Sequence, residues 1–144
     1  MKKLLLAISF IFISGCAGFG GAKGVAYPGL NEINQGQAQL YIYRPSHFVM
    51  SYGIPSFLID NEVALSIRNG SYSVYNLTPG KHKLELKKNG NWIFESAELE
   101  VELPPEKRVF LRLSSNFGAA VLESVPEAQA VSELGNLLYT GSWP

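Results

Sequence analysis

The sequence has one cysteine, no long apolar segment and no excess of either charge. Because Cys16 has no second cysteine to pair with, an internal disulfide and a cysteine-based metal site are both excluded. The 12 basic residues match the 12 acidic ones, and removal of residues 1–15 would leave 10 basic against 12 acidic residues. Nucleic acid and anionic lipid both select concentrated positive charge. The overall balance therefore gives no electrostatic reason to expect either partner, and we expect no nucleic-acid binding.

The first fifteen residues have the composition of a signal peptide. Two lysines precede the apolar run Leu4–Ile13, which is interrupted only by Ser9. A transmembrane helix needs roughly 20 apolar residues, so this run is too short to be one, but it is typical of a signal peptide. A plain secretory signal with a coincidental cysteine, or a cysteine buried in the core, is the alternative interpretation of this segment.

The residues Ile13-Ser14-Gly15-Cys16 resemble the bacterial lipobox. The resemblance implies transfer of diacylglycerol to the Cys16 sulfur, cleavage before Cys16 and acylation of the new amino group by a fatty acid such as palmitate. Two or more acyl chains form a stable membrane anchor. Ala17 is not the aspartate of an inner-membrane retention signal, so for a Gram-negative host we expect the outer membrane, on its periplasmic face.

Residues 16–36 contain many glycines and little charge, which predicts a flexible tether after the lipidated cysteine. From residue 37 to residue 144, short runs of β-forming residues alternate with turn residues. This pattern predicts one mainly β domain, a small antiparallel β-sandwich of about seven strands with a short C-terminal helix. The expected strands are 39–44, 56–59, 63–67, 71–75, 81–88, 92–103, 108–114 and 119–125.

Turn residues predict how these strands are connected. Asp60-Asn61 indicates one turn, while Asn69-Gly70 and Asn89-Gly90 each predict a tight hairpin, because that turn needs positive φ. The helix is predicted after Pro126, with Ser124 and Glu127 resembling a capping box. Its apolar face is predicted from residues at helical spacing, which are Ala128, Val131, Leu134 and Leu138.

Four short motifs occur in a recognisable order. They are Leu40-Tyr41-Ile42-Tyr43-Arg44-Pro45, Leu58-Ile59-Asp60-Asn61, Asn69-Gly70-Ser71-Tyr72 and Leu77-Thr78-Pro79-Gly80-Lys81-His82. Together they resemble a family of small proteobacterial lipoproteins that is defined only by a domain of unknown function. Their rhythm is also similar to PEGA-type modules, which are associated with carbohydrate, and to other transthyretin-like sandwiches. The resemblance covers residues 37–125 and implies a sandwich in the cell envelope, without assigned catalytic residues.

The sequence offers little for catalysis. His47 and His82 are the only histidines and are not spaced like a known metal site, and no Gly-x-Ser-x-Gly motif occurs. His82 falls on the apolar side of its strand, where we expect a structural, partly buried side chain. We therefore predict no catalytic, cofactor-binding or metal-binding residue and no enzyme. A hydrolase, the less favoured alternative, would need a histidine in a cleft with a carboxylate or serine.

The polar faces of two strands and a set of aromatics leave binding functions open. One strand places lysines and the next glutamates on one face, which we interpret as solvated rather than as a binding stripe. Arg44 is expected to be structural, stacking on an aromatic ring or holding a carboxylate. The aromatics in question are Tyr41, Tyr43, Phe48, Tyr52, Phe57, Tyr72 and Tyr75. Most are expected in the core, but exposed Phe48, Tyr52 and Trp143 would form a patch for a protein or glycan.

The leading hypothesis is a non-enzymatic lipoprotein, anchored through Cys16, whose sandwich binds another envelope component, in the first place a protein. The alternative is a module that binds glycan or peptidoglycan.

Overall fold

The computed structural model describes residues 21–47, 51, 53–116 and 118–141. The predicted signal peptide, Cys16 and the aromatics Phe48, Tyr52 and Trp143 lie outside this part of the chain. The described residues form nine strands and one helix. None of the helices in that part is long and apolar enough to cross a membrane.

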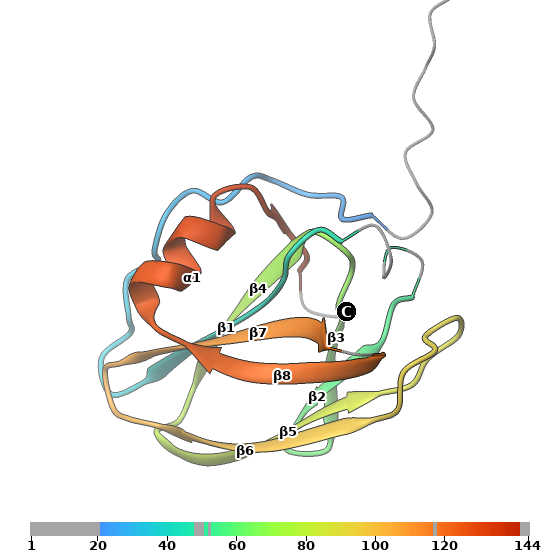
Figure 1. Cartoon of the computed structure of the whole chain (residues 1–144). Coiled ribbons are helices and arrows are strands. Elements are labelled where there is room, and N and C mark those ends of the chain that lie inside the picture. Colours follow the sequence, from blue (N-terminus) through green and yellow to red (C-terminus); the bar gives the residue numbers. More distant parts are fainter. Residues whose placement is uncertain (1–20, 48–50, 52, 117, 142–144) are drawn as a thin grey trace, which may run out of the picture.

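The strands form two sheets that pack face to face (Figure 1). The five-stranded sheet has the order β8-β7-β1-β4-β9 and the four-stranded sheet the order β3-β2-β5-β6. The strands are β1 (Ala38–Arg44), β2 (Ser56–Ile59), β3 (Glu62–Ser66), β4 (Ser71–Leu77), β5 (Gly80–Lys87), β6 (Ala97–Leu103), β7 (Arg108–Asn116), β8 (Ala119–Val125) and β9 (Leu138–Tyr139). The predicted mainly β sandwich with a short C-terminal helix is confirmed. Two of its strand pairs, β1–β7 and β4–β9, are parallel, so the five-stranded sheet is mixed rather than purely antiparallel.

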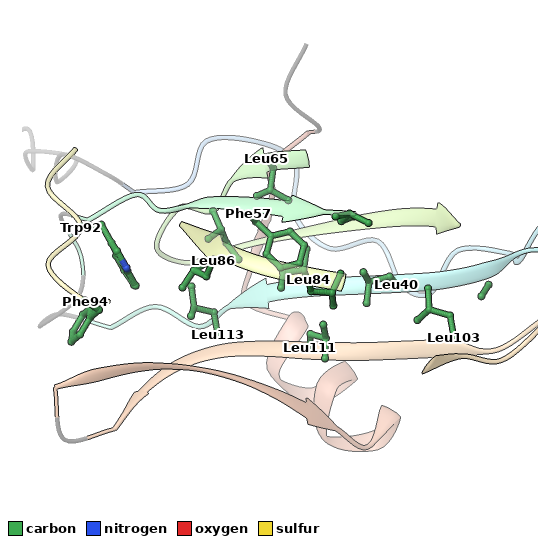
Figure 2. Packing of buried hydrophobic residues seen from close by; sticks show 14 residues of the cluster. Leu40, Phe57, Leu65, Leu84, Leu86, Trp92, Phe94, Leu103, Leu111 and Leu113 are labelled. Atoms are coloured by element: carbon green, nitrogen blue, oxygen red, sulfur yellow. The ribbon is translucent and has the colours of Figure 1, made fainter. Parts of the chain in front are cut away.

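The main core lies between the two sheets. Alternate residues of each strand point into it, as the period of two in a strand requires. Figure 2 shows leucines of β1, β5 and β7 meeting Phe57 of β2, with Trp92 and Phe94 at one end of the cluster. Each fully buried leucine or phenylalanine contributes about 1.5–3 kcal/mol relative to an exposed one. The predicted strand 92–103 begins only at Ala97, because the chain first places Trp92 and Phe94 in this core.

A second cluster fills the other face of the five-stranded sheet, beneath the helix α1 (Glu127–Leu134) (Figure 1). Strand β1 is therefore covered on both faces, and all seven of its residues are buried. Tyr41 and Tyr43 face α1, while Leu40 and Ile42 face the other sheet. A strand in the middle layer of three needs apolar or aromatic side chains on both faces.

The predicted helix exists, but two of its details were wrong. Pro126 is its N-cap and makes no side-chain cap hydrogen bond, so the capping box of Ser124 and Glu127 does not form. The buried helix residues are Ala130 and Leu134, whereas Leu138 belongs to β9. The helical spacing continued by chance into a strand, because the chain turns after Leu134.

The hairpin predicted at Asn69-Gly70 was also wrong. This segment carries the chain from β3 in one sheet to β4 in the other, where β3 pairs with β2 and β4 pairs with β1. Gly70 does adopt the expected positive φ of 72°. A local turn signal thus fixes a backbone angle, while the pairing is decided by burial of the strand faces. The turn at Asp60 and Asn61 joins β2 to β3, as predicted. The connection that contains Asn89-Gly90 does join β5 to β6, but it runs from residue 88 to residue 96, so the tight hairpin predicted there does not form.

The described part of the predicted tether, residues 21–36, differs from a free linker because it lies along the domain. Backbone hydrogen bonds join Ala22 N to Asn69 O (3.0 Å) and Tyr27 N to Leu137 O (3.2 Å). The Tyr27 ring packs edge-on against Tyr72, with ring centroids 5.4 Å apart. Gly24 lies where a Cβ would collide with a backbone oxygen of β9. Glycine at this position therefore allows the backbone of residue 24 to approach β9 closely. Composition alone does not distinguish such a glycine from one in a flexible linker.

Candidate functional site

A cleft of about 540 Å³ opens beside the end of β7, between the segment after β1 and the helix α1. We call it the Arg112 cleft; it is lined by Pro45, His47, Arg112, Leu113, Ser114, Ser115, Asn116 and Glu133. The alternation of side-chain directions along β7 explains why polar residues line the cleft. Leu111 and Leu113 point into the core between the sheets, so Arg112 and Ser114 point to the face on which α1 packs.

Arg112 is fixed in this cleft by two glutamates. Its Nε and Nη2 donate to Glu123 Oε1 at 3.0 and 2.9 Å, and its Nη1 donates to Glu133 Oε1 at 2.7 Å. Glu123 lies directly opposite Arg112 in the β7–β8 register, and it also accepts a hydrogen bond from Ser114. Partial burial disfavours the charge of Arg112, but Glu123 and Glu133 outweigh it and raise its pKa.

Glu133 connects the helix to two strands of the sheet. Its Oε2 accepts a hydrogen bond from the Tyr43 hydroxyl of β1 at 2.7 Å, and its Oε1 accepts one from Gln129 at 3.0 Å. Burial opposes ionisation of Glu133, but these donors and the Arg112 charge lower its pKa overall. Burial and the Glu133 carboxylate raise the pKa of Tyr43. Near neutral pH the carboxylate is therefore ionised and the phenol protonated, so their hydrogen bond persists.

His47 shares this cleft with Glu133 and two serines, which is the combination that the hydrolase alternative needs. Glu133 is however committed to Tyr43 and Arg112, so the arrangement suits binding better than proton transfer. A general base works best with a pKa near the operating pH, whereas the pKa of Glu133 is lowered away from neutrality. The rim carries exposed polar side chains, His47, Ser115 and Asn116, that are able to exchange hydrogen bonds with a ligand. The network behind them holds Arg112 in one position.

His82 is a buried structural histidine, as its place in the strand predicted. Its Nδ1 lies 2.7 Å from Asp60 Oδ2 and its Nε2 lies 2.8 Å from the Thr78 carbonyl oxygen. Both ring nitrogens face acceptors, an arrangement that the doubly protonated ring satisfies. Burial opposes that charge, but the Thr78 carbonyl and Asp60 raise the pKa of His82 overall. The hydrogen bond from His82 lowers the pKa of Asp60.

The structure does not bring the two histidines together. His47 follows the end of β1, where its backbone N–H donates to the Asn69 side chain at 2.9 Å. His82 lies beside the Thr78 and Asp60 turns, at the opposite end of the sandwich. In the described ranges, no group of three or more histidine, cysteine, aspartate or glutamate side chains could hold a metal ion.

Arg44 has a structural position, as predicted. Its side chain is buried, its Nη1 donates to the carbonyls of Gly53 (2.6 Å) and Ile67 (3.0 Å), and its guanidinium carbon lies 5.3 Å from the centroid of the Trp92 ring. Loss of hydration on burial lowers the pKa of Arg44 to about 10. The side chain thus joins three connections at one end of the sandwich and lies over an aromatic ring, as expected.

The sequence matches a family described as "Protein of unknown function (DUF2846)" over residues 34–125, which is more than half of the chain. The chain belongs to this family. A comparison with curated proteins gave no match. The DUF2846 match begins just before β1 and ends with β8, so Glu133 of the Arg112 cleft lies in the helix that follows it.

The charged rows on this DUF2846 domain form a solvated face, as interpreted from the sequence. Lys81 Nζ lies 3.0 Å from Glu100 Oε1, and the two side chains are 72% and 67% exposed. Lys83 pairs with Glu85 at 2.6 Å. Glu85 itself is covered by its lysine neighbours, and the hydrogen bond from Lys83 lowers its pKa. An exposed pair such as Lys81–Glu100 contributes about 0.2–1 kcal/mol.

Most of the described aromatics that the sequence left open are part of one of the two cores. Tyr41, Tyr43, Phe57 and Tyr72 are buried, and Tyr75 is half-buried with its hydroxyl donating to the Ala64 carbonyl at 3.2 Å. The residues that would have formed an exposed patch are Phe48, Tyr52 and Trp143, all outside the described residues.

The residues that sequence reasoning missed are Arg112, Glu123 and Glu133. Aligning β7 with β8 about the turn at Gly118 places Arg112 opposite Glu123, so a cross-strand signal for this pair was present. Glu133 had no comparable signal. Its position depends on where the helix docks, which the strand pattern does not specify.

Proposed function

We propose that this DUF2846 protein is a lipoprotein of the cell envelope, anchored by lipid on Cys16, and that its sandwich is a non-enzymatic module that binds another envelope protein. The lipobox-like residues before Cys16 support the anchor. The Arg112 cleft supports the binding role and is the observation that carries it.

The cleft has the composition of a protein interface. Arginine is enriched at the centres of such interfaces, where its planar donor group is most useful when already held in place. Glu123 and Glu133 hold Arg112 before any partner arrives, so little side-chain entropy would be lost on binding. Pro45 adds apolar surface to the same cleft.

The anchor is tested by metabolic labelling with a palmitate analogue, comparing the wild type with Cys16→Ser after separation of inner and outer membranes. We expect label on the wild type only, in the outer membrane. Unlabelled wild type found soluble in the periplasm would show that the protein is not lipidated.

The binding role is tested with a photoreactive amino acid placed at Ser115, on the rim of the Arg112 cleft, in living cells. The matched control carries it at Lys107, an exposed residue at the other end of β7. We expect a discrete crosslinked protein at position 115 that is absent at 107 and weakened by His47→Glu. Equal adducts at both positions would count against the cleft. If no crosslinked protein is found and the protein instead co-sediments with purified sacculi, the glycan-binding alternative would be favoured.

A further inference from the structure

The N-terminal segment enters the domain at one end of the sandwich. Gly21 forms a parallel bridge with Asn69, in the connection from β3 to β4. That connection lies where β1 ends and β4 begins, since Arg44 pairs with Ser71. Figure 1 shows the first described residues on the same side of the molecule as the connection from β5 to β6. We call this the entry end, formed by the connecting segments 21–24, 45–47, 67–70 and 88–96.

The covalent distance from Cys16 to this end is short. Five residue steps separate Cys16 from Gly21, and a fully extended chain covers at most about 18 Å in five steps. The longest strands, of eight and nine residues, extend about 26–30 Å from the entry end toward the far end. A lipid on Cys16 would therefore hold the entry end close to the bilayer, with the far end directed away from it.

The charges of the connecting segments differ between the two ends. The described entry-end segments carry three basic residues and one acidic residue: Lys23, Arg68, Lys88 and Glu95. The far-end segments 28–37, 60–61, 78–79 and 104–107 carry one basic residue and three acidic ones: Lys107, Glu32, Asp60 and Glu106. The chain as a whole is balanced, so this asymmetry arises only from the way in which the strands fold.

The entry end also presents one apolar side chain to solvent. Ile93, in the connection from β5 to β6, is 76% exposed, although its neighbours Trp92 and Phe94 are buried at 1% and 7%. Figure 2 shows Trp92 and Phe94 held within the core. Because both neighbours are fixed inward, Ile93 is fixed outward. Amphipathic surfaces that lie on a bilayer combine such an apolar residue with lysine and arginine.

We propose that the entry end is a membrane-contacting surface, with Lys23, Arg68 and Lys88 on anionic phospholipid headgroups and Ile93 at the boundary of the acyl chains. This inference rests on the proposed function, since lipid on Cys16 brings the surface to the bilayer. A basic residue near an anionic surface strengthens the contact about fivefold, which corresponds to about 1 kcal/mol. The Arg112 cleft, which includes His47 of this same end, would then lie near the headgroups.

The test uses the lipidated full-length product reconstituted in vesicles. Lipid blocks the Cys16 thiol, so an introduced cysteine is the only one free to take an environment-sensitive fluorophore. Ile93→Cys reports on the entry end, and Glu62→Cys is the matched control at the exposed start of β3, beside the far-end turn 60–61. We expect spin-labelled lipids to quench the fluorophore at position 93 and not at position 62, more strongly when phosphatidylglycerol is present in phosphatidylcholine vesicles.

A charge variant makes the test specific for the basic surface. Lys88→Glu, in the Ile93→Cys background, should weaken the quenching at position 93 several-fold, whereas Lys107→Glu should leave it unchanged. Mass spectrometry of each preparation reports the lipid on Cys16. Lipidated protein with equal or absent quenching at positions 93 and 62 would overturn this inference and leave the anchor intact. Protein without lipid would overturn the anchor and this inference together.

Discussion

The hydrogen bond between Tyr43 and Glu133 should hold the helix α1 on the sheet, and a double-mutant cycle measures its contribution. Tyr43→Phe removes the donor to Glu133, which is partly exposed at 25%, so water replaces some of the lost bond. We expect this change to lower the free energy of unfolding by about 1 kcal/mol, below the 1.5–3 kcal/mol of a fully buried hydrogen bond to a charged group.

Glu133→Ala should be more damaging. It leaves the Tyr43 hydroxyl without its acceptor beneath the helix and removes one of the two carboxylates on Arg112. Leaving a buried hydroxyl unsatisfied costs about 1–3 kcal/mol, and the lost, partly exposed ion pair adds less than 1 kcal/mol because Glu123 still holds Arg112. We expect a total loss of about 2–3 kcal/mol.

The double variant should lose about 1 kcal/mol less than the sum of the two single variants, because both remove the same bond. Urea unfolding of the mature chain without lipid, followed by circular dichroism, gives all four free energies at unchanged m-value. Gln129→Ala is the control: this exposed donor bonds the same glutamate and should change stability by less than about 0.5 kcal/mol. Losses that add within about 0.3–0.5 kcal/mol would show that Tyr43 and Glu133 are not coupled and would refute the argument.

Three other changes test the packing and the pH dependence. Trp92→Ala should cost about 3–5 kcal/mol, as expected for a fully buried tryptophan, measured by urea unfolding; a loss below 1 kcal/mol would show that this connection does not complete the core. Gly24→Ala should cost about 1–3 kcal/mol, because its Cβ meets the backbone of β9, and an unchanged unfolding midpoint would show that residues 21–36 do not pack on the domain. The pKa of His82 is raised by folding, so its bond to Asp60 stabilises fully below about pH 6.5, its ordinary value, and this stability is lost as pH rises through the folded pKa. The wild type should lose about 1 kcal/mol of its free energy of unfolding across that interval, a small value because Asp60 is half exposed. His82→Gln should lose none. The reasoning would be contradicted if the melting temperatures of the two proteins changed in parallel from pH 5 to 8.

Much of the local structure could be predicted because it depends on neighbours in sequence. The alternation of residues 81–87 placed Leu84 and Leu86 in the core and the lysines in solvent, and the paired strand β6 has the complementary glutamates. The structural role of His82 followed from the same alternation. The candidate cleft could not be predicted in the same way, since it forms only where α1 docks over the face of β7 that carries Arg112.

The chain by itself determined where most of its strands lie, which face of β5 and β6 meets water, and the lipobox-like residues that suggest an anchor. These properties depend on side-chain period, on φ preferences and on composition over a few residues. Only the tertiary structure decided that Asn69-Gly70 crosses between sheets, that β1 is buried on both faces and that residues 21–36 lie along the domain. Each of these outcomes depends on apolar surface contributed by segments far apart in sequence. The charge asymmetry between the two ends has the same origin, because folding brings to one end Lys23, Arg68 and Lys88, which lie in separate segments of the sequence.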